Sequence, residues 1–474
     1  MTNSFQRLHS VFDRQKAAHD SDPVPSIDVR LERIARLAGA VTASRTRLHD
    51  AIRVDFGAHD GQLTDLMEIG PVLQRAAHVS AHLADWIAPR SVDLGPEHGS
   101  SRGRVLHLPK GVMGNIAPWN FPIESALVMC VDMLAAGNRI IIKPSELAPS
   151  TAQAVEDLVA GAFDESELAV VQGDVEFARA FSEMPWDHLT FTGSPRVGRL
   201  VAQAAARSLV PVTLELGGKN PALFMPDGID DGLVKLFLSF RTLKAGQVCT
   251  SPDYVFVPES RLEGWIATAC AVWTAAYPAY VGHPDATGII NAQHYRRLTG
   301  YLDEARSRGV RVVSLNGEAP DEGLRQIPPT LVVTPPDDLA CMQEEVFGPV
   351  IPVVTYGALD EAIARINAGP SPLASYIVTH DETAAEVFVR RVRSGGAAVN
   401  NFGLQGGHVA LPFGGFGASG HGCHSAREGV LGYTHVKSVF HGAADSMVHQ
   451  VLAPPLSDLT RFAADGMYIS AAGD

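Results

Sequence analysis

The sequence predicts an α/β protein in which two α/β segments follow one another along the chain. One segment alternates strand-like and helix-like stretches from Gly111 onward, and a second alternation begins after Glu215. Such alternation is typical of parallel sheets covered by helices on both faces, which bind ligands at the carboxyl ends of their strands. The 474 residues, 46% hydrophobic and 19% charged, fit a soluble globular protein of two or three domains.

Helices are expected before the first alternating segment. Apolar residues recur at three-to-four spacing from about Val29 to Asp55, which predicts one long amphipathic helix, and Leu63 to Trp86 predicts another. Gly95 and Pro96 then mark a turn, and Arg104 to Leu108 has the pattern of a strand.

The two alternating segments supply the expected sheet strands and their covering helices. The first has strands at Val112 to Ala117, Arg139 to Lys143, Leu168 to Val171 and His188 to Thr192, and helices at Ile123 to Ala135, Thr151 to Ala162 and up to Phe181. The second has strands near Ala222 to Met225, Asp253 to Val257, Thr330 to Val333, Val350 to Val354, Ser375 to Val378 and Ala397 to Val399. Its helices are expected near Gly232 to Leu243, Leu262 to Ala276, Asn291 to Ser307, Leu359 to Ala368 and Glu382 to Arg393.

Charge and composition exclude several classes of protein. A net charge of -14 argues against a nucleic-acid partner, because neutralising phosphates requires a basic face. Five cysteines at irregular spacing form neither a CxxC zinc pair nor a disulfide framework, which suits a reducing compartment. The N-terminal residues lack the apolar stretch of a secretory signal, and no segment is apolar enough to span a membrane. We therefore expect a cytoplasmic protein with no membrane partner.

Three side chains could support chemistry on a carbonyl group. Cys249 follows small and flexible residues that would let a substrate approach its thiol, whereas a lone cysteine is usually an inert buried side chain. Glu215 ends a strand-like run and is a candidate base, or simply a glutamate bound to backbone or water. Asn120 lies between two prolines that fix its amide, or is only a turn asparagine. Together they supply a nucleophile, a base and an oxyanion donor.

Two strand ends could hold an anionic ligand. Lys143, Ser145 and Glu146 follow one strand, where the lysine could bind a ribose or phosphate, or pair with Glu146 at the surface. Gly193 and Ser194 follow another, where the serine caps a helix whose free amides could hold a pyrophosphate. The usual GxGxxG dinucleotide fingerprint is absent.

Seven motifs in one order resemble the aldehyde dehydrogenase family. They are PWNFP at Pro118 to Pro122, KPSE at Lys143 to Glu146, FTGSPRVG at Phe191 to Gly198, LELGGKNP at Leu214 to Pro221, AGQVC at Ala245 to Cys249, EEVFGPV at Glu344 to Val350, and LPFGGFGASG at Leu411 to Gly420. The resemblance covers nearly the whole chain, except the first twenty-odd and last thirty-odd residues, and is strongest to the class 3 and coniferyl aldehyde dehydrogenase branch.

The resemblance implies the role of each matching residue. Cys249 would be the nucleophile, Glu215 the base and Asn120 the oxyanion donor, in NAD(P)-dependent oxidation of an aldehyde to a carboxylic acid. The residues implied to bind the cofactor are Pro118, Trp119, Lys143, Ser145, Glu146, Gly193, Ser194, Gly198, Leu216, Gly217, Glu345 and Phe347. Glu146 would favour NAD by repelling a ribose phosphate, although NADP stays possible.

The resemblance also implies how the chain is divided. Residues 1–92 and 108–214 would form a Rossmann-type NAD(P)-binding domain, and 215–410 an α/β catalytic domain. Residues 93–107 and 411–474 would form a small β oligomerisation element and a C-terminal tail, in a homodimer. The substrate would be a small aromatic or medium-chain aldehyde, with coniferyl aldehyde as one candidate. The alternatives are a coenzyme A-acylating semialdehyde dehydrogenase, which generally lacks the glutamate at 215, and a non-catalytic structural protein.

Two features depart from the family pattern or suggest other chemistry. The family usually has asparagine where Lys244 stands, and this added cation could either lower the thiol pKa or point to solvent. His421, Cys423 and His424 suggest a metal site, but their spacing is poor for tetrahedral coordination, so we expect no metal.

Overall fold

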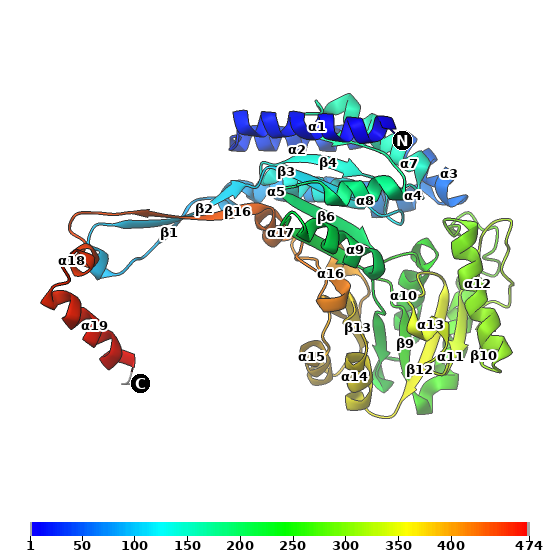
Figure 1. Ribbon diagram of the computed structural model, residues 1–474. Helices are drawn as coiled ribbons and strands as arrows, with labels where there is room; N and C mark the ends of the chain where they lie inside the picture. The colour runs from blue at the N-terminus through cyan, green and yellow to red at the C-terminus, as the bar shows by residue number, and fades with distance from the viewer. Residues whose placement is uncertain (1, 472–474) are drawn as a thin grey trace.

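A computed structural model describes residues 2–471, which form two α/β lobes and a long arm (Figure 1). Three sheets organise them, with six strands in the first lobe, seven in the second and three in the arm. The α/β class predicted from the sequence is confirmed.

The first lobe is built on a sheet in the order β15-β7-β6-β3-β4-β5, parallel except for β15. Its elements are α1 (Thr2–Ser21), α2 (Ile27–Ala43), α3 (Arg45–Phe56), α4 (Gly61–Thr64), η1 (Asp65–Ile69), α5 (Gly70–Trp86), β3 (Val112–Ile116), α6 (Glu124–Ala135), β4 (Arg139–Lys143), α7 (Pro149–Ala162), β5 (Leu168–Val170), α8 (Val175–Glu183), β6 (His188–Gly193), α9 (Pro195–Ala206), β7 (Val212–Leu216), η6 (Gly417–Ser419), β15 (Gly420–His421) and α17 (Ala426–Gly432).

Both faces of this sheet are covered, which explains why its strands are almost continuously apolar. Alternate strand residues such as Ile140 and Ile142 pack against α2, α5, α6 and α7. Their neighbours, such as Val112 and Ile141, pack on the other face against α1, α8 and α9.

The second lobe contains a sheet in the order β10-β11-β12-β9-β8-β13-β14, parallel except for the edge strand β10. Its elements are β8 (Pro221–Phe224), η3 (Pro226–Gly228), α10 (Asp231–Thr242), η4 (Leu243–Gly246), β9 (Tyr254–Pro258), η5 (Glu259–Arg261), α11 (Leu262–Ala276), α12 (Ala292–Ser307), β10 (Arg311–Ser314), β11 (Thr330–Val333), α13 (Ala340–Gln343), β12 (Val350–Tyr356), α14 (Leu359–Ala368), β13 (Ala374–Val378), α15 (Glu382–Arg391), β14 (Gly396–Val399) and α16 (Leu404–Gly407). Helices α10 and α11 pack on one face, and α14 and α15 on the other.

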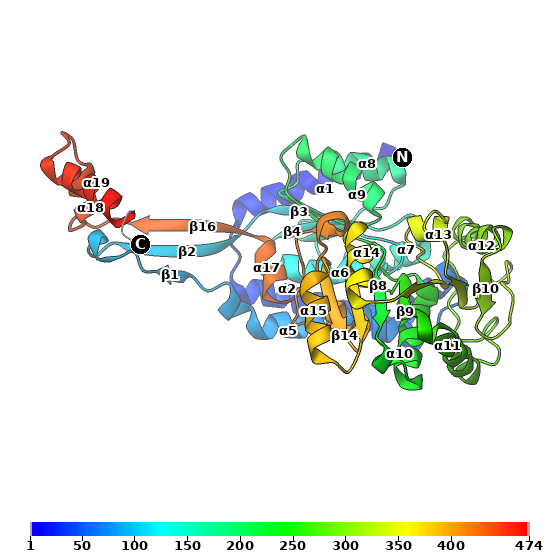
Figure 2. The same ribbon diagram turned by 90° about the horizontal axis from the view of Figure 1, so that it is seen from below.

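The arm projects away from both lobes (Figures 1 and 2). It consists of β1 (Arg90–Val92), η2 (Pro96–His98), β2 (Arg102–Pro109), β16 (Thr434–His441), α18 (Met447–Leu452) and α19 (Asp458–Ala471). Strand β2 pairs antiparallel with β16 along its whole length, from Arg102 opposite His441 to Pro109 opposite Thr434. Between residues 2 and 471, no helix combines the length and apolar character needed to cross a membrane.

Residues 411–474 do not all belong to the arm. Strand β15 pairs with β7 in the first sheet, and α17 packs against α5 and α6. The predicted domain boundaries and the oligomeric role of the arm stay predictions.

Three N-terminal features differ from expectation. The predicted helix from Val29 to Asp55 is two helices, because the chain bends at Ser44, which ends α2 and precedes α3. The predicted helix from Leu63 to Trp86 contains the π-helical turn η1 before α5. Helix α1, which was not expected, buries Leu8 and Val11 against the first sheet.

Candidate active site

A cleft of about 2250 Å³ is lined by both lobes and contains most of the residues singled out in the sequence. Those that line it are Pro118, Trp119, Asn120, Lys143, Ser145, Glu146, Gly193, Ser194, Glu215, Gly217, Cys249, Glu345 and Phe347. Gly198 and Leu216 do not line it. They pack against each other instead, since a Cβ at Gly198 would lie 2.6 Å from Leu216 Cδ2, so the glycine brings α9 close to β7.

Cys249 is half-buried and follows a turn with unusual backbone geometry. Lys244, Ala245 and Gly246 have φ of 50°, 55° and 74°, in the left-handed region. A Cβ at Gly246 would lie 2.4 Å from Arg241 Nη1 and 2.6 Å from Gly348 O, so only glycine fits there. This turn delivers Cys249 to the cleft.

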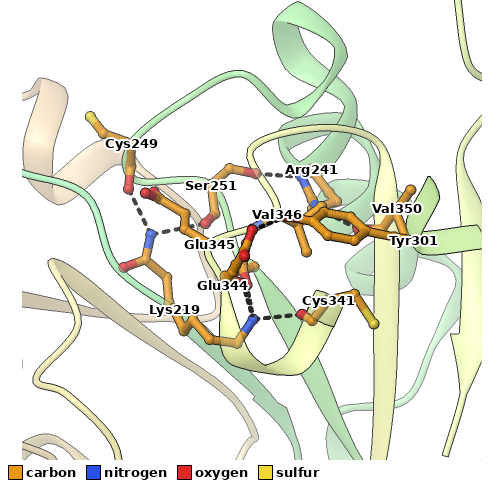
Figure 3. A network of polar contacts seen from close by, with 12 residues as sticks. Lys219, Arg241, Cys249, Ser251, Tyr301, Cys341, Glu344, Glu345, Val346 and Val350 are labelled. Carbon is orange, nitrogen blue, oxygen red and sulfur yellow. Dashed lines mark hydrogen bonds and ion pairs between the residues drawn. The ribbon is translucent and has the colours of Figure 1, made fainter. Parts of the chain in front are cut away.

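The backbone after the turn is fixed by Asn220. Its Nδ2 donates to Cys249 O at 2.7 Å and to Ser251 O at 2.9 Å, while Oδ1 accepts from Ala374 N at 2.9 Å. The Cys249 sulfur points away from this network of polar contacts (Figure 3). The thiol is therefore left clear of the hydrogen bonds that hold its main chain.

Asn120 lies next to this segment. Its buried Nδ2 donates to Gln247 O at 3.2 Å, two residues before Cys249. Gln247 is itself held by its side chain, which donates to Lys244 O and Gly288 O and accepts from Ile290 N. The Asn120 amide is thus held against the segment that leads to Cys249.

Glu215 lies on β7, opposite Gly420 of β15, and is 3% exposed. Neither carboxyl oxygen has a hydrogen-bond partner among the described residues, although both are buried. Burial raises the pKa of Glu215 well above its usual value, and the charge of Glu124 raises it further. A buried carboxyl with no partner in the fold is typical of a functional group.

The thiol has a similar environment. Burial raises the pKa of Cys249, and the carboxylates of Glu124, Glu345 and Glu215 raise it further.

Lys244 neither points to solvent nor lines the cleft. It is fully buried, and its Nζ pairs with the equally buried Glu68 of η1 and donates to Asn120 O at 2.6 Å. Nζ also lies 4.3 Å from the centre of the Phe121 ring. Burial lowers the pKa of Lys244, and Glu68 opposes that fall.

Glu68 also holds the start of α6. It accepts from Ile123 N at 3.1 Å and Glu124 N at 2.9 Å, which are free amides at a helix N-terminus. One buried ion pair thus joins η1, the Asn120 loop, α6 and the turn before Cys249.

The cofactor residues expected at two strand ends lie together at another part of the cleft. Lys143 is 2% exposed and pairs with Glu146 at 2.5 Å. Ser194 caps α9 by accepting from Val197 N at 3.4 Å, with Pro195 at the first helical position. The nearby Thr192 Oγ1 is buried without a partner.

The loop that carries Glu345 and Phe347 is held by hydrogen bonds from Lys219 and to Asp253 (Figure 3). Lys219 Nζ pairs with Asp253 and donates to Cys341 O and Glu344 O, each at 2.9 Å. Asp253 Oδ1 accepts from Val346 N at 2.7 Å. This clamp holds the Glu345 loop at the rim of the cleft.

Glu345 and Phe347, which the sequence predicts to bind the cofactor, lie against residues of the first lobe. The Phe347 and Trp119 rings lie 5.3 Å apart, edge to face. A Cβ at Gly217 would lie 2.2 Å from Glu345 Oε2, so this glycine leaves room for the carboxylate. Burial, with the charge of Asp253, raises the pKa of Glu345 to about 8.

This arrangement fits a dinucleotide. The buried Lys143 and its exposed partner Glu146 lie at one strand end, and the next strand end has a helix N-terminus and the Thr192 hydroxyl, which has no partner among the described residues. Glu345 lines the same cleft as Cys249.

Comparison with known proteins decides the family. Residues 11–439 match the aldehyde dehydrogenase family. The chain belongs to that family. Oxidation of aldehydes to carboxylic acids with a nicotinamide cofactor is the reaction of aldehyde dehydrogenases, as predicted from the sequence.

Relatives confirm the resemblance to the coniferyl branch. The chain is 38% identical over 440 residues to the coniferyl aldehyde dehydrogenase of Pseudomonas sp. (strain HR199 / DSM 7063), covering 92% of this chain and 90% of that protein. It is 36% identical over 458 residues to a probable coniferyl aldehyde dehydrogenase of Caulobacter vibrioides, and the match covers 95% of this chain and 94% of that protein.

Solved structures agree. Staphylococcus aureus AldH in a substrate-bound state superposes with a TM-score of 0.91 at 32% identity, covering 97% of this chain and 99% of that one. The Mycobacterium tuberculosis aldehyde dehydrogenase complexed with NAD+ superposes with a TM-score of 0.78 at 29% identity. The match covers 90% of this chain and 88% of that one.

The structure adds three residues to the site that the sequence did not predict, and it bears on the possible metal site near His424. In the described part of the chain, no group of three or more His, Cys, Asp or Glu is placed to hold a metal. His424 lines the cleft, with its Nδ1 buried and unpartnered. Asn220, although within the LELGGKNP motif, was not singled out, and Glu68 and Glu124 belong to none of the seven motifs.

The ion pair gives a test of stability. Replacing Lys244→Met should destabilise the protein by about 3–5 kcal/mol, because Glu68 is left as an unpaired buried charge. Glu68→Gln in the same chain should recover part of that loss. Thermal and urea unfolding of the two single variants and the double variant measures both effects, and additive losses would contradict direct pairing.

Proposed function

We propose that the chain oxidises an aromatic or medium-chain aldehyde to its acid through a thiohemiacetal and a thioester on Cys249, with NAD as the preferred cofactor. The observation that carries this proposal is the convergence of Cys249, Asn120 and Glu215 on one cleft that also fits a dinucleotide. The identity of each catalytic and cofactor-binding residue belongs to the proposal.

The protein's own groups suffice for the first bond. The Cys249 sulfur attacks the aldehyde carbon, and the carbonyl oxygen becomes an oxyanion that accepts hydrogen bonds from Asn120 Nδ2 and Cys249 N. Removing such a donor typically costs 10²–10³-fold in rate. Glu215, with both oxygens free, takes the thiol proton.

Collapse of that oxyanion releases hydride and leaves a thioester on Cys249. A nicotinamide bound in the cleft would supply the hydride acceptor, and Lys143, Glu146, Ser194, Glu345 and Phe347, which all line the cleft, would hold that cofactor. Glu215 first releases the thiol proton to solvent and is again a carboxylate. It then removes a proton from water as the water attacks the thioester, and that proton passes to the departing Cys249 sulfur. The products are the carboxylic acid and the free thiol.

The presence of Glu215 favours hydrolysis over transfer of the acyl group to coenzyme A. A buried carboxyl without a partner is suited to proton removal and contributes nothing visible to the fold. The retention of Cys249 and Asn120, both in contact with the cleft, argues against a purely structural role.

The proposed substrate follows from the named relatives, and the proposed cofactor preference follows from Glu146. Relatives named coniferyl aldehyde dehydrogenases favour a phenylpropanoid aldehyde. Glu146 beside Lys143 favours NAD, because a carboxylate there repels a ribose phosphate. A homodimer in the cytoplasm is part of this proposal.

The nucleophile can be tested by substitution. Cys249→Ala should abolish NADH formation from NAD and aldehyde, measured by nicotinamide absorbance without coenzyme A, while cofactor binding persists. Wild-type protein that forms no NADH unless coenzyme A is added would overturn the hydrolytic proposal. Activity surviving in the alanine variant would show that another group attacks.

The pH dependence follows from the carboxyl. Since burial raises the pKa of Glu215, the group is protonated at low pH and becomes a base only as pH rises through that raised pKa. Because the pKa of Cys249 is also raised, the fraction of thiolate likewise increases as pH rises. We expect kcat to increase with pH over a range that lies well above the usual titration range of a carboxyl group. In the Glu215→Gln variant, kcat should be lower than in the unsubstituted protein by about 10²–10⁴-fold. A rate that declines with rising pH would contradict this role.

A further inference from the structure

Glu124 is a cleft residue that the proposed reaction does not use. It is the first residue of α6, four residues after Asn120, and is half-buried. It lines the same cleft as Cys249 and Glu215. Its charge also raises the pKa of both groups, so it lies close to the reaction centre.

The fold makes little use of this carboxylate. Glu124 Oε2 accepts from Ser125 Oγ at 2.8 Å, and within residues 2–471 no partner is found for Oε1. The helix start itself is held through the Glu124 main-chain amide, which donates to Glu68. The side chain therefore has an accepting oxygen to spare.

No nearby cation is available to pair with it. The charged and titratable groups around Glu124 are Glu68, Arg75 and Lys244, with Glu215 and Cys249 across the cleft. Arg75 Nη1 donates to the buried Asp132 at 2.7 Å, and Lys244 is paired with Glu68. Burial raises the pKa of Glu124 to about 7, as expected for a carboxyl without a cationic partner.

The surrounding wall is mostly apolar. The side chains that line this cleft include Leu66, Met67, Phe121, Phe240, Leu243 and Phe413. A ligand in this cleft therefore meets apolar surface, and Glu124 lines the same cleft with one oxygen that has no hydrogen-bond partner among the described residues. A hydroxyl already donates to one oxygen of Glu124, that of Ser125, so a second hydroxyl suits the other oxygen.

We propose that Glu124 selects aldehydes whose apolar body carries a hydroxyl group, by accepting a hydrogen bond from that hydroxyl. This inference rests on the proposed function, since it assigns the aldehyde to this cleft. Glu124 is a specificity-determining residue in this account and takes no part in bond making.

Binding can be measured without turnover. In the Cys249→Ala background, para-(hydroxymethyl)benzaldehyde and meta-(hydroxymethyl)benzaldehyde are titrated calorimetrically against the matching tolualdehydes, which lack only the hydroxyl oxygen. At least one hydroxylated ligand should bind more tightly than its partner by on the order of tenfold, as a charge-assisted hydrogen bond predicts. Adding Glu124→Leu should remove that difference.

Control variants distinguish a specific effect of Glu124 from a general effect of losing a carboxylate or of misfolding. Glu386→Gln removes a surface carboxylate on α15, which pairs with Arg390, and should leave the hydroxyl preference unchanged. Glu124→Asp, which keeps the charge on a shorter side chain, should retain part of the preference. Circular dichroism and cofactor titration of each variant show that it is folded.

Two results would overturn the proposal. Either both pairs of ligands bind equally to the Cys249→Ala protein, or the preference persists unchanged after Glu124→Leu. Failure of the proposed function gives a different result, since the protein with Cys249 intact would then form no NADH from any of the four aldehydes, whatever their binding.

Discussion

The buried ion pair between Lys244 and Glu68 is the interaction on which the site geometry depends. Taking two charges out of water costs several kcal/mol per ion, and the cost is recovered only when each charge is fully hydrogen-bonded. Here Glu68 accepts two main-chain amides of α6 besides the lysine, and Lys244 donates to the Asn120 carbonyl. The arrangement gives both charges hydrogen-bond partners and fixes the Asn120 loop relative to the turn before Cys249.

The same constraint explains why the turn can hold an unusual backbone. Left-handed φ values at Lys244 and Ala245 cost of order 1–3 kcal/mol each unless the surroundings determine them. The Lys244 side chain is anchored at η1, Gly246 is packed against Arg241 and Gly348, and Asn220 holds the main chain beyond. The Cys249 backbone is therefore held on both sides, while its sulfur points away from the hydrogen bonds that Asn220 makes (Figure 3).

The sequence predicted the sheet strands and most motif positions because these depend on local patterns. Strand β4, for example, matches the predicted bounds Arg139 to Lys143. The partner of Lys244 could not be predicted, since Glu68 lies 176 residues away in a π-helical turn with no recognisable motif. The sequence likewise gave no signal for Glu124, whose significance comes from the cleft that it faces. Periodicity alone did not locate the break at Ser44, because both helices present apolar residues to one core.

The cleft combines a thiol and three carboxyls whose pKa values are all raised by burial. The central claim is that the acyl group resides on Cys249 and that Glu215 is needed to release it. Intact-mass and peptide mass spectrometry of Glu215→Gln, quenched with acid after mixing with NAD and an aromatic aldehyde, tests this directly. We expect the acyl mass on the peptide that contains Cys249, in close to one equivalent per chain. An unmodified Cys249 peptide, or an acyl group on a different cysteine, would contradict the account.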